Sequence, residues 1–192
     1  MCEPRSFKLW LLQFFVLLGL LAFFLWLGLR PKNPRYAIVD FSVQVPNSNA
    51  TTGVNQGQNG TISFNLEIQN PNKDSSIYYE DILLTLFYNE DSVGQKMIPR
   101  FHQGKDKTTH IVDQMDASAR VRNTLLINMS NKTAELKASL ATRIQYQTWG
   151  VKSKHHQMNM QGFVKIGSDG KISGKKKIKL HRVSGKSRMK LA

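Results

Sequence analysis

The stretch TISFNLEIQ, residues 61–69, alternates apolar and polar side chains without a break. In a β-strand this alternation gathers the apolar residues on one face. Those residues are Ile62, Phe64, Leu66 and Ile68. The next three residues, Asn70-Pro71-Asn72, must leave the sheet, because proline has no N–H to donate and asparagine favours turns. The stretch therefore predicts a strand that is buried on one face and ended by a turn.

The same alternation recurs along the chain. Residues 37–45 would place Phe41, Val43 and Val45 on one face, and a strand from Tyr78 to Tyr88 would do so with Ile82, Leu84 and Leu86. Asn59-Gly60 is a strong turn signal. Further strands are predicted near 96–99, 110–115, 121–128, 142–149 and 157–166, and residues 133–140 are the one plausible helix. This pattern predicts a mainly β chain: an antiparallel β-sandwich of the immunoglobulin or fibronectin type with one short helix.

An uncharged apolar run, residues 9–29, precedes these strands. At about 1.5 Å per residue it would reach about 30 Å, the thickness of a bilayer core. Trp10 and Trp26 lie near its two ends, where interfacial aromatic residues are expected. A cleaved signal peptide would have a shorter apolar region and small residues at a cleavage site, whereas Arg30-Pro31-Lys32 follows here. We therefore expect a retained transmembrane signal-anchor helix.

These features divide the chain into five segments. They are a short head (1–8), the transmembrane helix (9–29), a basic juxtamembrane linker (30–35), the β-sandwich (36–183) and a basic tail (184–192). Charge is unevenly distributed, with a net charge of +4 over residues 1–35, −3 over 36–135 and +13 over 136–192. The centre and the C-terminal end of the chain must therefore form surfaces of different charge.

The basic C-terminal end predicts contact with a polyanion. The candidate contact residues are Lys175, Lys176, Lys177, Lys179, Arg182, Lys186, Arg188 and Lys190. Acidic polysaccharide and anionic lipid are the expected partners. Nucleic acid is not expected, because no binding module is recognisable. The alternative is structural, since residues 172–180 alternate like a half-buried final strand, and lysines on an edge strand block aggregation.

Orientation across the membrane depends on opposing signals. Four Asn-x-Ser/Thr sequons follow the apolar run, and sequons are modified only on the lumenal or extracellular side. Their asparagines, the N-glycosylation candidates, are Asn49, Asn59, Asn128 and Asn131. Basic residues flank both ends of the run, so the positive-inside rule leaves the orientation undecided. The sequons favour a cytosolic N-terminus and an extracellular β-sandwich.

Cys2 is the only cysteine, so the chain cannot form an internal disulfide. Its place close to the membrane and to Lys8 makes it a lipidation candidate, with an unmodified free cysteine as the alternative. No nucleophile motif, zinc-protease motif or phosphate-binding loop occurs. His155 and His156 would point to opposite faces of a strand, which makes a poor metal clamp. We expect no enzyme activity, no cofactor and no metal site.

Two motifs carry a resemblance to a known family. Asn70-Pro71-Asn72 with Tyr78-Tyr79, and the segment PRFHQGKDKT at residues 99–108, resemble the NPN…YY and P-F-Y-Q-G-x-K-x-T elements of a plant membrane family. Its members are the harpin-induced-like and non-race-specific disease resistance-like proteins. A looser block, residues 143–155, is similar to the family's basic strand. The chain departs from the pattern at His102, which replaces a tyrosine, and at 158–163, where relatives often have a cysteine.

The resemblance implies a group-two late embryogenesis abundant domain, also called a water-stress and hypersensitive-response domain, which is a β-sandwich. It implies a role in plant defence or stress signalling at the plasma membrane, including plasmodesmata, with defence-signalling proteins as partners. We expect the motif residues to be structural: asparagines that fix the turn, tyrosines on opposite strand faces and a glycine with an unusual backbone angle. They are Asn70, Pro71, Asn72, Tyr78, Tyr79, Pro99, Phe101, Gln103 and Gly104.

Two other functions stay open. In the first, the domain faces the cytosol as a membrane-tethered scaffold, and its basic end binds anionic lipid. The basic residues Arg30, Lys32 and Arg35 just after the anchor favour this alternative, whereas the sequons oppose it. In the second, the domain protects membranes during desiccation without a specific partner, and then no function would depend on motif residues such as Tyr79.

Overall fold

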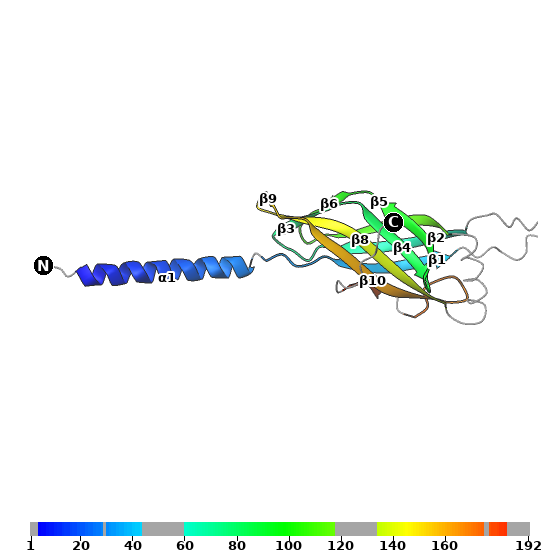
Figure 1. The fold of residues 1–192 in the computed structure, drawn as a ribbon, viewed down its shortest axis with the longest axis horizontal. Helices are drawn as coiled ribbons and strands as arrows, with labels where there is room; N and C mark the ends of the chain where they lie inside the picture. The colour runs from blue at the N-terminus through cyan, green and yellow to red at the C-terminus, as the bar shows by residue number, and fades with distance from the viewer. Residues whose placement is uncertain (1–3, 29, 44–59, 118–133, 175–176, 184–192) are drawn as a thin grey trace, which may run out of the picture. The chain divides into compact units, whose positions relative to one another are not determined.

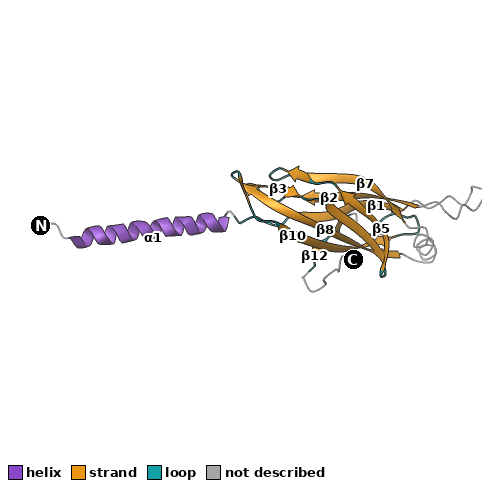
Figure 2. Cartoon of the chain, turned by 45° about the horizontal axis from the view of Figure 1, so that its top comes forward, coloured by secondary structure: helices purple, strands orange, loops and turns teal. Residues whose placement is uncertain are grey.

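The computed structural model describes residues 4–28, 30–43, 60–117, 134–174 and 177–183. The chain separates into two compact units, Met1–Lys32 and Asn33–Ala192. The first unit contains the helix α1 and the second contains all of the described strands (Figures 1 and 2).

Helix α1 spans Pro4–Gly28. It begins at Pro4, before the predicted apolar run. Proline is tolerated there because it lies in the first turn of the helix. Its window Phe7–Phe24 has a mean hydropathy of 2.1, with Lys8 as its one charged residue, and none of it is buried within the molecule. By length and composition this helix can cross a membrane.

The described strands form two antiparallel sheets. The first sheet has the order β11-β1-β2-β7. Its strands are β1 (Arg35–Val43), β2 (Gly60–Gln69), β7 (Thr108–Ala117) and β11 (Ile178–Lys179). Strand β2 pairs with β7 along its full length and with β1 across one irregularity between Ile38 and Asp40.

The second sheet is built around β8 (Ala134–Thr148), the longest described strand. On one side β8 pairs with β10, and on the other it pairs first with β4 and then with β3. In addition, β5 pairs with β4, β6 with β3, β12 with β10, and β9 with the end of β8. The other members are β3 (Ser75–Tyr79), β4 (Ile82–Tyr88), β5 (Asp91–Ile98), β6 (Phe101–Gln103), β9 (Val151–Lys152), β10 (His156–Ile166) and β12 (His181–Arg182).

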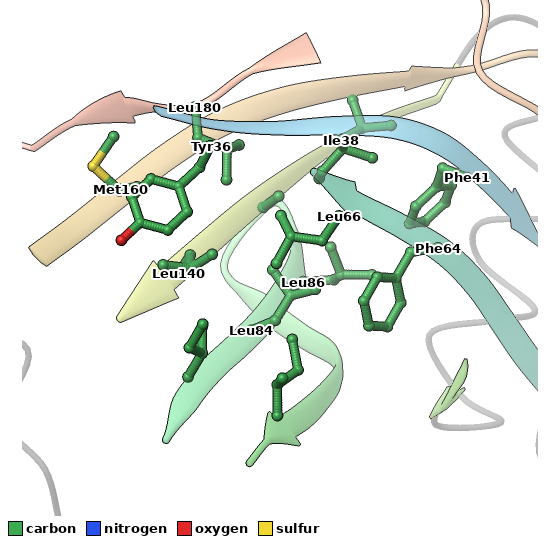
Figure 3. Close-up of a cluster of buried hydrophobic side chains, with 14 of the residues drawn as sticks. Tyr36, Ile38, Phe41, Phe64, Leu66, Leu84, Leu86, Leu140, Met160 and Leu180 are labelled. Atoms are coloured by element: carbon green, nitrogen blue, oxygen red, sulfur yellow. The ribbon is translucent and has the colours of Figure 1, made fainter. Parts of the chain in front are cut away.

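One hydrophobic core lies between the two sheets (Figure 3). Phe64 and Leu66 of β2 face the same interior as Leu84 and Leu86 of β4. The four residues of β2 predicted to point inward are all buried. The predicted antiparallel two-sheet architecture is thus confirmed, while the immunoglobulin or fibronectin type stays a prediction.

The predicted helix at 133–140 is wrong, because residues 134–140 belong to β8. Ala134, Leu136, Ala138 and Leu140 are buried, and the residues between them include the exposed Glu135. This period of two buries an apolar face against the opposite sheet. That burial outweighs the helix propensity of alanine, leucine, glutamate and lysine.

The predicted strand from Tyr78 to Tyr88 is interrupted at Glu80-Asp81, so the structure has β3 and β4 in its place. The Glu80 N–H donates to the Arg143 carbonyl at 2.9 Å, and the Thr142 hydroxyl donates to the Glu80 carbonyl at 3.1 Å. Both pieces therefore stay paired with β8. The predicted features at Val45, Asn59 and 121–128 lie outside the described residues.

Candidate functional site

The two family motifs lie side by side at one end of the β unit. The Asn70 N–H donates to the Lys107 carbonyl, and the Asp106 N–H donates to the Asn72 carbonyl, both at 2.9 Å. The turn after β2 is thereby joined to the turn between β6 and β7. Neither motif predicts this contact by itself, because the two turns are separated by about thirty residues of chain.

Asn70 is the centre of this contact, and its side chain is fully buried. Its Nδ2 donates to the carbonyls of Ser75 and Gly104, each at 2.9 Å. Its Oδ1 accepts from the backbone N–H of Asn72 at 3.0 Å and from the Asn72 Nδ2 at 2.8 Å. One amide therefore satisfies groups on both turns and at the start of β3.

Gln103 of β6 connects the two sheets at the same end, and it is 2% exposed. Its Nε2 donates to the Ile68 carbonyl at 2.8 Å and contacts Thr109 Oγ1 at 2.9 Å, both in the first sheet. Its Oε1 accepts from the Tyr79 hydroxyl at 2.9 Å, in the second sheet. Sequence reasoning did not single out Thr109, since no motif marks it. We call Asn70, Asn72, Tyr79 and Gln103 the motif network.

The two motif tyrosines point to opposite faces, as the strand period predicts. Tyr79 is buried and stacks on Phe101 with ring centroids 4.6 Å apart. Tyr78 faces outward, and its hydroxyl donates to Gln147 Oε1 at 2.9 Å. Its ring lies 4.3 Å from the His102 ring, centroid to centroid.

The expectation for Gly104 is wrong, because this glycine does not have a positive φ. A Cβ there would make an ordinary contact, 3.6 Å from Lys107 Cγ. The left-handed backbone of this turn falls on Asp106 instead, with φ 49°. Gly104 contributes its carbonyl to the motif network. Pro99 separates β5 from β6, where a residue without an N–H cannot continue the sheet.

Tyr36 and Tyr79 provide a matched test of the motif network. The Tyr36 hydroxyl is buried without a hydrogen-bond partner among the described residues, whereas the Tyr79 hydroxyl is bonded to Gln103. Tyr79→Phe should lower the free energy of unfolding by about 1–3 kcal/mol, because it leaves the buried Gln103 Oε1 unsatisfied. Tyr36→Phe should be neutral or slightly stabilising. Denaturant unfolding of both variants measures the difference, and equal losses would contradict this assignment.

The basic C-terminal segment crosses from one sheet to the other. β11 pairs with β1 in the first sheet, and β12 pairs with β10 in the second. Leu180 between them is buried, and its N–H donates to the Tyr36 carbonyl at 2.9 Å. Gly162 leaves room for this crossing, since a Cβ there would lie 2.6 Å from Leu180 Cδ2. Of the predicted final strand, residues 172–180, the described part forms only the short strand β11 and an isolated bridge at Ile172, and β12 follows it.

A groove of about 990 Å³ lies along this crossing. We call its basic residues the basic edge: Lys165, Lys177, Lys179, His181 and Arg182. Phe163 lines the same groove and is 59% exposed. Lys177 Nζ contacts Glu67 Oε1 at 2.5 Å, so part of its charge is compensated. Phe163 points to the face of β10 opposite to that of the buried Met158, Met160 and Val164. Strand alternation could therefore have predicted its exposure.

Several predicted candidates lie outside the described residues. They are Cys2, Asn49, Asn59, Asn128, Asn131, Lys175, Lys176, Lys186, Arg188 and Lys190. The described residues that flank the sequon segments are Val43, Gly60, Ala117 and Ala134. The strand registers place them at the end of the β unit opposite to the motif network.

Glu80 lies in a polar depression of about 460 Å³ lined also by Asp81, Arg100 and Arg143. Its carboxylate contacts His155 Nε2 at 3.0 Å and Arg143 Nε at 3.7 Å. The Asp81 carboxylate accepts from the Arg100 N–H at 2.9 Å. Both carboxylates thus have partners that hold the break between β3 and β4. Within the described ranges, no three His, Cys, Asp or Glu side chains gather as a metal site would require.

The fold and these sites define a class of protein: a two-sheet β domain that follows a helix able to span a membrane, with a polar network at one end. The chain belongs to the late embryogenesis abundant protein family, whose model matches residues 65–162. This match confirms the resemblance inferred from the two motifs, and the relatives below extend it.

The chain is similar to protein NDR1 of Arabidopsis thaliana, with 28% identity over 180 residues, covering 89% of this chain and 80% of that protein. It is also similar to NDR1/HIN1-like protein 6 of the same plant, with 34% identity over 94 residues, covering 47% of this chain and 35% of the relative. The solution structure of AT1g01470 from Arabidopsis thaliana has a TM-score of 0.48 at 14% identity, covering 72% of this chain and 85% of that chain.

Proposed function

We propose that this protein is a single-pass plasma-membrane glycoprotein whose non-catalytic β domain acts outside the cell in plant defence or stress signalling. The observation that carries the proposal is the similarity to NDR1 over 89% of the chain. The exposed apolar helix α1 supports membrane anchoring, because an apolar surface of this length needs a lipid environment. Plasmodesmata are included in the proposed location, on the family resemblance alone.

The sequons support an extracellular domain. Glycans are hydrophilic and bulky, so they are best accommodated on a part of the domain that does not face another surface. The residues flanking both sequon segments lie opposite to the motif network, which is the end where the chain from α1 enters β1. The described strand ends that border both sequon segments are thus far from the point of entry.

The basic edge is the proposed contact surface for acidic cell-wall polysaccharide. Lys179 and Arg182 are exposed, and they border a groove that also presents the Phe163 ring. Cations would pair with uronate carboxylates, while the aromatic ring would pack against the apolar face of a sugar. Attraction of this kind weakens as ionic strength rises. Through this contact, changes in the cell wall would act on the anchored domain. The domain would then pass the signal to defence-signalling proteins.

Binding of the full chain in detergent micelles to immobilised polygalacturonate tests this mechanism. The double variant Lys179→Gln with Arg182→Gln should bind about tenfold more weakly, since each exposed charge contact contributes up to about 1 kcal/mol. Lys73→Gln with Lys105→Gln removes the same charge at the motif turns, outside the basic edge, and should bind as the parent does. If both double variants weaken binding equally, or if neither weakens it, the basic edge is not the specific binding surface.

A cytosolic scaffold is the second candidate. Arg30, Lys32 and Arg35 follow the helix directly, as expected of a cytosolic flank. The basic edge would then meet anionic lipid of an apposed membrane. In that arrangement no sequon could be modified, so the glycosylation state separates the two candidates.

A further inference from the structure

The turn between β8 and β9 presents an apolar tip. Trp149-Gly150 is the two-residue loop that joins Thr148 to its partner Val151. Trp149 is 71% exposed and Val151 is 74% exposed. Two large apolar side chains on one turn are costly to leave in water, so this tip needs a surface to cover it.

The backbone of this turn also disfavours its own sequence. Trp149 has φ 50° and Gly150 has φ 84°, so both residues are in the left-handed region. Two-residue hairpin loops of this kind favour asparagine or aspartate followed by glycine. A bulky side chain at positive φ carries a steric cost. Turn geometry therefore does not account for Trp149, and a residue held at such a cost points to a function for its side chain.

Exposed lysines surround the tip. Lys152 and Lys154 follow Val151, and Lys152 Nζ lies 4.3 Å from the centroid of the Tyr78 ring. The motif turns add Lys73, Lys105 and Lys107, against two aspartates, Asp74 and Asp106. The hydroxyls of Ser75 and Thr148, 2.5 Å apart, join these turns to the hairpin. This end of the β unit therefore combines an aromatic tip with a net positive charge.

The chain from α1 enters the β unit at this same end. The Tyr146 hydroxyl donates to Asn33 Oδ1 at 3.2 Å, and Tyr146 precedes Trp149 by three residues. Helix α1 ends at Gly28, and five peptide steps from Gly28 to Asn33 span at most about 17 Å. Chain length alone therefore keeps this end of the β unit within reach of the interface of a bilayer that holds α1.

We propose that the β8–β9 turn is a second membrane contact, in which Trp149 and Val151 enter the bilayer interface and Lys152 and Lys154 contact phospholipid phosphates. Tryptophan favours the headgroup level of a bilayer, and lysines close to a membrane surface are attracted to anionic lipid. The proposal rests on the proposed anchor. The motif network holds the two turns beside this hairpin, and the Ser75–Thr148 contact joins them to it, so the network would help to fix the membrane-facing end of the domain.

The chain has three tryptophans, Trp10, Trp26 and Trp149, so one can be observed alone. The full chain with Trp10→Phe and Trp26→Phe is reconstituted into phosphatidylcholine vesicles, with or without phosphatidylserine, that contain a headgroup spin label. Trp149 emission should shift to the blue and lose intensity through quenching. Quenching in both vesicles indicates contact at the phosphates, and quenching only with phosphatidylserine indicates anionic recognition; both support the proposal. Emission as in water without quenching would overturn it.

Two controls make the result specific. Lys152→Gln with Lys154→Gln should reduce the quenching, whereas Lys137→Gln with Lys171→Gln, which removes the same charge elsewhere, should not. Equal effects of the two pairs would overturn the lysine contact. Flotation of the same vesicles separates the hairpin from the anchor: protein that floats while Trp149 stays unquenched refutes the hairpin contact alone. Protein that does not float refutes the anchor, and the hairpin contact with it.

Discussion

Replacing Asn70 by alanine should lower the free energy of unfolding by about 3–5 kcal/mol, since each buried polar group left without a partner costs about 1–3 kcal/mol. The Asn70 side chain bonds the Ser75 and Gly104 carbonyls and the Asn72 N–H, and it is fully buried. Alanine would leave these three groups unsatisfied at the junction of two turns. Denaturant unfolding of the full chain in detergent micelles, followed by circular dichroism, measures the loss.

Asn159→Ala is the matched control, because Asn159 is exposed on β10 and far from the turns. Surface substitutions of this kind usually change stability by about 0.5 kcal/mol or less. A similar small change for Asn70→Ala would mean that the motif asparagine does not hold the fold. Its presence in the motif would then need a binding role.

Alkaline pH should destabilise the β domain steeply between pH 10 and about 12. Burial raises the pKa of Tyr36 and of Tyr79 far above the ordinary value of 10.0, and burial raises the pKa of Tyr146 to about 12. Below pH 10 all three are neutral in both the folded and the unfolded chain, so the stability is intact. Above it the unfolded tyrosines ionise while the folded ones do not, which costs about 1.4 kcal/mol per tyrosine and pH unit.

Three such tyrosines would together remove about 4 kcal/mol per pH unit, a large share of the stability of a small domain. Tyr36→Phe should reduce this pH dependence by about one third, with little effect at pH 7. Unfolding curves at a series of pH values, together with ultraviolet absorption of tyrosinate, provide the measurement. Ionisation of all five tyrosines near pH 10 in a chain that stays folded would contradict the burial of these rings.

The fold could be predicted where burial follows a simple local period. Residues 61–69 show the strand period without interruption, and β2 has the predicted inward face. Residues 134–140 also alternate, but alanine, leucine, glutamate and lysine are good helix formers, and their propensity misled the prediction. These residues form a strand because the opposite sheet buries their apolar face. That is a long-range contact, which a short stretch of sequence cannot show.

The candidate site shows the same limit. The motifs identified Asn70 and Gln103, and strand alternation predicted opposite faces for Tyr78 and Tyr79. Neither could reveal that Gln103 bonds the Ile68 carbonyl across the two sheets, because a backbone acceptor carries no residue-specific signal. The apolar tip at Trp149 was equally hidden. Its exposure depends on a two-residue turn that places the ring outside the core.

The location of the β domain outside the cell is the central claim, and a glycosidase mobility shift tests it most directly. The protein is expressed in plant cells with Asn49, Asn59, Asn128 and Asn131 each changed to glutamine in turn. The account predicts a shift on glycosidase treatment that becomes smaller or disappears with at least one of these changes. No shift in any form, together with a β domain protected from external protease, would place it in the cytosol and contradict the account.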